Sequence, residues 1–127
     1  MENKRVLVVE DSPFMQVFIK KTLEKFHCII DICSSGAEAI DVIAEGEYDL
    51  IFLDCQLPVL SGYEVASEIR DREKKGYIRH KNTIVACTAN SMEGDRQRCL
   101  DAGMDDHIVK PVTDGIIGGV LSKWLRS

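Results

Sequence analysis

Short apolar runs alternate with longer segments of helical periodicity along the chain, and the alternation repeats five times. Runs that are apolar at nearly every position are typical of strands buried on both faces of a parallel sheet. The second run instead alternates apolar and polar residues, which indicates a less completely covered strand. The runs that we interpret as strands are 5–9, 28–33, 50–53, 83–87 and 107–109.

The segments between these runs carry the signals of helix starts. Ser12 and Pro13 are a favourable N-cap and first helical residue, and apolar residues follow at helical spacing to Phe26. After Ser34-Ser35-Gly36, a second helix is predicted with this apolar stripe: Ala37, Ile40, Ile43 and Ala44.

The helix after the fourth strand is polar, and its few expected core anchors are Met92, Cys99 and Leu100. We therefore expect it to be the most weakly held helix.

Strands that alternate with helices predict right-handed crossovers, a parallel sheet and helices on both faces. The predicted fold is α/β and flavodoxin-like: a (βα)5, doubly wound, five-stranded parallel sheet with strand order 2-1-3-4-5. At 127 residues we expect one domain, covering residues 1–127.

Polar residues that can take part in catalysis or metal binding come directly after four of the apolar runs. Glu10 and Asp11 follow the first, Asp54 ends the third, Thr88 follows the fourth and Lys110 the fifth. In a parallel sheet these positions share the carboxyl edge, where open α/β sheets bind ligands. Three converging carboxylates are unfavourable unless a cation lies among them or one takes a proton. The sequence therefore predicts a divalent-cation site that contains a candidate nucleophile.

Each of these residues has a plausible task in phosphoryl transfer, where positioning and charge neutralisation dominate. Asp11 and Asp54 would ligate Mg²⁺, with Glu10 acting through a water molecule. Asp54 is the candidate nucleophile because carboxylates form acyl phosphates. Lys110 would supply a positive charge to a phosphoryl oxygen, and Thr88 would supply a hydroxyl donor.

Composition restricts the partners. The formal net charge of −5 and the pI near 5.2 argue against a nucleic-acid or anionic-membrane surface. Five cysteines without a C-x-x-C pair indicate reduced thiols in a cytosolic protein. No apolar run approaches the roughly 18 residues that a membrane span needs.

With these residues assembled, the chain resembles the receiver domain of two-component response regulators over essentially its whole length. The stretches that carry the resemblance are 8–12, 53–58 with Gly62, 88–90, and 103–106 leading to Lys110-Pro111. The residues 89–96 with Cys99-Leu100 and 103–106 are most similar to receivers of hybrid sensor histidine kinases.

The resemblance implies that Asp54 accepts a phosphoryl group in the presence of Mg²⁺ or Mn²⁺. It implies metal ligation by Asp11, Asp54 and the Gln56 main-chain carbonyl, and a cis Lys110-Pro111 peptide. His107 stands where the family usually has a switching Tyr or Phe, which favours a relay over an output switch. Gln56 and Asn90 border the path of the attacking water, and we expect them to tune dephosphorylation.

The partners implied are a histidine kinase phosphohistidine domain, a His-containing phosphotransfer domain, or both. We expect no direct contact with nucleic acid or membrane, and at most a weak homodimer. The expected location is the cytoplasm, where a parent sensor kinase could tether the domain to the membrane. Such a module catalyses its own phosphorylation and dephosphorylation but is not a turnover enzyme.

Four alternatives compete with a receiver from a hybrid kinase. The chain could be a stand-alone single-domain regulator, or a degenerate receiver that only binds partners. An aspartyl-nucleophile phosphatase would need an acid at position 56, which is Gln. A flavin module would need a Gly-, Ser- and Thr-rich loop where Glu10 and Asp11 stand.

Overall fold

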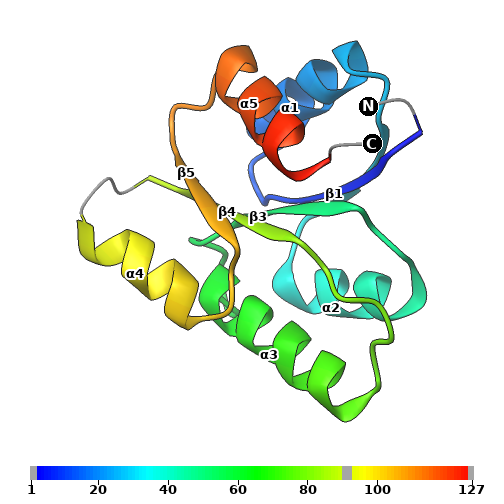
Figure 1. Ribbon diagram of the computed structural model, residues 1–127. Helices are drawn as coiled ribbons and strands as arrows, with labels where there is room; N and C mark the ends of the chain where they lie inside the picture. Colours follow the sequence, from blue (N-terminus) through cyan, green and yellow to red (C-terminus); the bar gives the residue numbers. More distant parts are fainter. Residues whose placement is uncertain (1–2, 90–92, 126–127) are drawn as a thin grey trace.

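A five-stranded parallel sheet runs through the centre of the protein, whose computed structural model describes residues 3–89 and 93–125 (Figure 1). The strand order is β2-β1-β3-β4-β5, so the predicted doubly wound topology is confirmed. The strands are β1 (Arg5–Val9), β2 (Ile29–Cys33), β3 (Leu50–Asp54), β4 (Ile84–Thr88) and β5 (Asp106–Val109).

Five helices cover the two faces of the sheet. Figure 1 shows α1 (Pro13–Lys25) and α5 (Asp114–Trp124) on one face, and α2 (Gly36–Glu45), α3 (Gly62–Lys75) and α4 (Glu93–Asp101) on the other. Because successive strand residues point to opposite faces, β1 contributes Val6 and Val8 to one core and Leu7 and Val9 to the other. Within the described residues, no helix has both the length and the apolar character needed to cross a membrane.

Local capping explains where the helices begin and end. The Ser12 hydroxyl accepts a hydrogen bond from the Met15 N–H, so the predicted N-cap of α1 is confirmed. Ser61 and Glu64 form a reciprocal capping box at the start of α3. That helix ends at Gly76, which adopts the left-handed conformation that glycine tolerates best.

The predicted apolar stripe of α2 was wrong at two of its four positions. Ala37 and Ala44 are exposed, whereas Ala39 is buried together with Ile40 and Ile43. The true and the predicted stripes both pass through the two isoleucines. A methyl side chain can lie on either side of such a stripe, so the alanines did not distinguish them.

Helix α4 has little apolar anchorage, as predicted. Among the α4 side chains that the structure describes (94–101), Cys99 alone is buried. Leu100 is 40% exposed, so its expected role as an anchor was wrong. Met92, the third expected anchor, lies outside the described residues.

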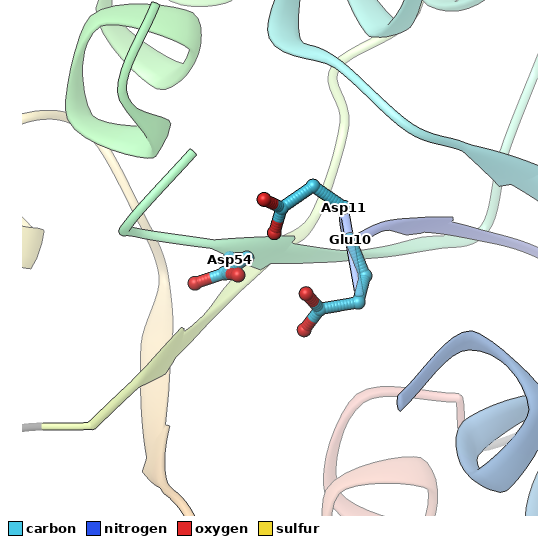
Figure 2. Close-up of side chains that lie close together, drawn as sticks. All are labelled: Glu10, Asp11 and Asp54. Carbon is cyan, nitrogen blue, oxygen red and sulfur yellow. The ribbon is translucent and has the colours of Figure 1, made fainter. Parts of the chain in front are cut away.

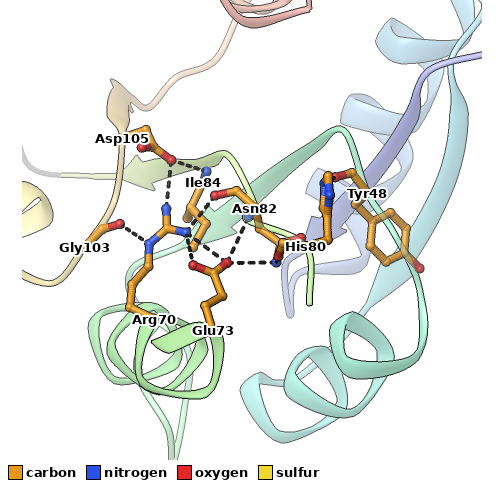
Figure 3. A network of polar contacts seen from close by, with 8 residues as sticks. All are labelled: Tyr48, Arg70, Glu73, His80, Asn82, Ile84, Gly103 and Asp105. Atoms are coloured by element: carbon orange, nitrogen blue, oxygen red, sulfur yellow. Dashed lines mark hydrogen bonds and ion pairs between the residues drawn. The ribbon is translucent and has the colours of Figure 1, made fainter. Parts of the chain in front are cut away.

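At the amino-terminal ends of β4 and β5, away from the polar strand ends, Arg70 joins three segments of the chain (Figure 3). Its guanidinium donates to the main-chain oxygens of Gly103 and Asn82, both at 2.7 Å. It also pairs with the carboxylates of Glu73 and Asp105, both at 2.9 Å. Since α3, β4 and the start of β5 meet here, this network fixes their relative positions.

The carboxylate of Glu73 is the second centre of the network. One of its oxygens accepts from the main-chain and side-chain N–H groups of Asn82, at 2.8 and 3.0 Å. Burial opposes ionisation, but the hydrogen bonds from Asn82 and Arg70 outweigh it and hold the pKa of Glu73 below its ordinary value. The resulting stabilisation is fully present above the ordinary pKa and is lost as the pH falls through the lower folded-state pKa.

Replacing Arg70 with Met should destabilise the fold by about 2–4 kcal/mol, because two partly buried carboxylates lose their positively charged partner. Met retains the helix propensity and much of the side-chain volume. Chemical denaturation measures the loss. The matched control is Arg72→Met on the same helix, which breaks only an exposed pair with Glu68 and should cost no more than about 0.5 kcal/mol. Equal effects of the two substitutions would contradict the assignment.

Candidate functional site

Three carboxylates converge at the carboxyl ends of β1 and β3. The parallel register pairs Val9 with Leu53, so the residues that follow them, Glu10 and Asp54, lie side by side. Each of Glu10, Asp11 and Asp54 offers an oxygen, and these oxygens lie within 4.8 Å of one another (Figure 2). The convergence predicted from the strand ends is confirmed.

Main-chain N–H groups hold the two buried carboxylates in place. Glu10 and Asp54 are almost fully buried, while Asp11 is exposed. The Ser12 N–H donates to one oxygen of Glu10 at 3.0 Å, and the Gln56 N–H donates to Asp54 Oδ1 at 2.9 Å. Because each carboxylate has one oxygen held in this way, its other oxygen is directed to the remaining groups of the site.

Lys110 supplies the positive charge of the site. Its Nζ lies 3.2 Å from Glu10 Oε1 and 3.2 Å from Asp54 Oδ2. The Lys110 N–H also donates to the main-chain oxygen of Thr88 at 2.7 Å, which fixes the residue at the end of β5. The peptide between Lys110 and Pro111 is cis, as the resemblance implied.

The site holds more negative charge than Lys110 balances. Burial, together with the nearby charge of Asp54, raises the pKa of Glu10. Burial disfavours the ammonium of Lys110, but the charges of Asp54 and Glu10 prevail and raise its pKa above the ordinary value. All-oxygen donors that include an exposed carboxylate match the preference of Mg²⁺, which keeps several water molecules. The residues therefore fit a hard divalent cation.

Thr88 is placed at the same edge of the sheet. It ends β4 and is fully buried, one residue beyond Cys87, which pairs with Asp54 in the register. His107 lies half-buried in the edge strand β5, paired with Ala86. Gln56 is exposed beside Asp54. Asn90, the other expected tuning residue, lies outside the described residues.

Two residues contribute to the site in ways that our sequence analysis did not anticipate. The Gln16 side-chain amide donates to the main-chain oxygen of Glu10 at 2.6 Å and to Ser34 Oγ at 3.1 Å. Gly62 lies so close to the Asp54 main chain that any Cβ would collide with the Asp54 carbonyl oxygen. A polar residue within the apolar pattern of α1 was the available signal for Gln16.

The sequence model of the response regulator receiver domain family matches residues 6–118. The chain belongs to this family. Among its relatives, hybrid signal transduction histidine kinase B of Dictyostelium discoideum is 37% identical over 97% of this chain and 7% of its own length. Probable histidine kinase 2 of Oryza sativa is 36% identical over 88% of this chain and 12% of its own length. The chain thus spans only a small part of these relatives.

Solved receiver structures share the fold and about a third of the sequence. The receiver domain of a sensor histidine kinase of Pseudomonas aeruginosa, with magnesium in its active-site cleft, is 35% identical. Its TM-score is 0.85, over 98% of this chain and 99% of that one. The receiver domain of Ssk1 of Saccharomyces cerevisiae, crystallised with the histidine phosphotransfer protein Ypd1, is 34% identical. Its TM-score is 0.91, over 97% and 89% of the two chains.

Asp11→Asn should weaken Mg²⁺ binding by at least about tenfold, a loss typical of changes around a metal site. The substitution removes one of the three clustered charges and leaves the exposed side chain with nearly the same shape. Isothermal titration calorimetry with MgCl₂ measures the change. Asp49→Asn is the matched control, because Asp49 precedes β3 at the opposite edge of the sheet. Unchanged Mg²⁺ affinity in Asp11→Asn would contradict the assigned site.

Proposed function

We propose that the domain, residues 1–127, accepts a phosphoryl group on Asp54 from a phosphohistidine in a two-component phosphorelay. The observation that carries the proposal is the placement of Asp54. Its carboxylate is buried, one oxygen is held by the Gln56 N–H, and the other is ion-paired to Lys110 beside two further carboxylates. A carboxylate held in this way is a positioned nucleophile.

In the proposed reaction, an Asp54 oxygen attacks the phosphorus atom of the donor. The P–O bond forms as the P–N bond breaks, and the bonding pair leaves with the histidine nitrogen. Asp11, Asp54 and the Gln56 carbonyl would hold Mg²⁺ or Mn²⁺, which supplies charge neutralisation for the transferred oxygens. The Lys110 ammonium, already within 3.2 Å of Asp54, pairs with a phosphoryl oxygen, and the Thr88 hydroxyl donates to another.

The lifetime of the acyl phosphate is set by the rate at which water hydrolyses it. Gln56 and Asn90 are the proposed tuning residues, since Gln56 is exposed next to Asp54 and would border an approaching water. Gln56 has no carboxyl group to activate that water, so the site supports slow self-dephosphorylation rather than turnover of phosphoesters. His107 takes the switch position of the family, and we assign it a modest role in a relay.

The relatives favour a place within a longer signalling protein. Because the chain matches a small part of large histidine kinases, we propose that it serves as the receiver of a hybrid sensor kinase in the cytoplasm. The second candidate is a stand-alone single-domain regulator, which the similarity to response regulator protein TrrA of Thermotoga maritima favours, because the match covers 95% of this chain and 98% of that one.

An apolar surface next to the site is the proposed docking face for the donor or acceptor. Phe14 and Val17 of α1 are 78% and 53% exposed, and apolar side chains that gather at one surface can mark an interaction site. Phe14 also lines a shallow groove of about 510 Å³, together with Met15, Phe18, Lys110, Pro111 and Val112. We propose a helix of a His-containing phosphotransfer protein as its occupant, because the similar Ssk1 receiver was crystallised with such a protein.

Incubation with acetyl phosphate and Mg²⁺ should add one phosphoryl group to the wild-type protein. Asp54→Asn should abolish this addition, since an amide oxygen is not an adequate nucleophile. Intact-protein mass spectrometry measures both. Asp49→Asn, which makes the same change at the far edge of the sheet, should behave as wild type. The proposal fails if the wild type gains no mass, or if Asp54→Asn gains as much as wild type.

Phe14→Ser should slow transfer from phosphorylated Ypd1 by about tenfold, the effect of losing one moderate apolar anchor. Phosphorylation by acetyl phosphate should stay unchanged, because Phe14 does not touch Asp54 in this mechanism. The matched control is Tyr77→Ser, which removes an aromatic side chain that is 73% exposed at the opposite edge. Equal transfer rates in Phe14→Ser and wild type would rule out the docking face.

A further inference from the structure

Two thiols are in contact next to the carboxyl end of β3, where Asp54 lies. Cys55 follows Asp54, and Cys99 lies on α4, 44 residues further along the chain. Their sulfur atoms are 4.0 Å apart, and both side chains are buried. All five cysteines lie in the described part of the chain, and this is the one pair whose sulfur atoms are in contact.

The contact has mechanical importance because Cys99 anchors α4. It is the buried side chain among those described on that helix. Tyr63 of α3 flanks the pair, and burial, followed by the neighbouring Cys55, raises the pKa of its hydroxyl. The Arg98 guanidinium lies over the Tyr63 ring, 4.0 Å from its centroid, and closes the cluster from outside. The buried side chain of α4 thus meets the residue after β3 through a contact between two thiols.

We propose that Cys55 and Cys99 form an intramolecular disulfide when the protein meets hydrogen peroxide, and that this bond locks α4 to the residue next to Asp54. A disulfide needs sulfur atoms about 2.0 Å apart. The two sulfurs must therefore approach by about 2 Å from van der Waals contact, which requires side-chain rotation and a small shift of α4. A helix with one buried anchor can make such a shift.

The oxidation balances with one peroxide molecule. The Cys99 thiolate attacks a peroxide oxygen, the O–O bond breaks, and the products are a sulfenic acid and, after protonation, water. The Cys55 sulfur then attacks the Cys99 sulfur, and the S–O bond breaks to release a second water. Both thiol hydrogens leave in water, and two electrons pass from the sulfurs to the peroxide.

Access to Cys99 depends on the movement of α4. Burial raises the pKa of the Cys99 thiol and shields it in the closed protein. Opening of the weakly anchored helix exposes this thiol to the oxidant, and reclosure returns it to Cys55. Formation of this disulfide needs no phosphorylation, so its test is independent of the proposed function.

The test is non-reducing peptide mapping of the purified protein after treatment with hydrogen peroxide. Cleavage by trypsin and Glu-C separates the relevant thiols: Cys28 and Cys33 fall in 26–38, Cys55 in 48–64, Cys87 in 82–93 and Cys99 in 99–123. We expect a disulfide-linked pair of 48–64 with 99–123, loss of two of the five thiols and a higher melting temperature for the oxidised protein. Reduction with dithiothreitol should reverse all three.

Two variants complete the test. Cys28→Ser removes a half-buried thiol outside the pair and should leave the linked peptides and the rise in melting temperature unchanged. Cys99→Ser should abolish both, whatever its own melting temperature, because the comparison is between its oxidised and reduced forms. The proposal is overturned if the wild type keeps all five thiols. It is also overturned if the disulfide joins other cysteines, or if the melting temperature of oxidised Cys99→Ser still rises.

Discussion

Repulsion among three carboxylates at one edge of the sheet is the constraint on which the rest of the structure depends. Glu10, Asp11 and Asp54 lie together because the parallel register aligns the ends of β1 and β3. Lys110 offsets part of their charge from β5, two strands beyond β3 in the sheet. The remaining negative charge is what makes the site suited to a divalent cation.

The two edges of the sheet are built differently. At the edge away from the site, the Arg70 network binds α3, β4 and β5 with charge-assisted hydrogen bonds that leave little freedom. At the site edge, Cys99 is the buried side chain among those described on α4. In the loop that follows Asp54, Val59 has a φ of 68°. That conformation is strained for a β-branched residue. The strand ends at the Arg70 network are held firmly, whereas α4 and the loop after Asp54 are less constrained. This difference is consistent with a site that accepts and releases a group.

The sequence alone predicted the strand order and the five polar residues at the strand ends. Each of these residues follows an apolar run directly, and a parallel sheet collects such positions at one edge. The contacts of Arg70 could not be predicted, because two of its acceptors are main-chain oxygens whose positions depend on tertiary packing. The contact between Cys55 and Cys99 could not be predicted from the apolar pattern either. Buried cysteine resembles any small apolar residue in a hydrophobicity pattern.

The central claim is that the carboxylate of Asp54, rather than its neighbours Glu10 or Asp11, becomes the acyl phosphate. Borohydride reduction of the acetyl phosphate-treated protein, followed by peptide sequencing, locates the modified carboxyl group directly, because an acyl phosphate is reduced to an alcohol. The account predicts homoserine at position 54 and unmodified side chains at positions 10 and 11. Reduction products at position 10 or 11, with Asp54 intact, would contradict it.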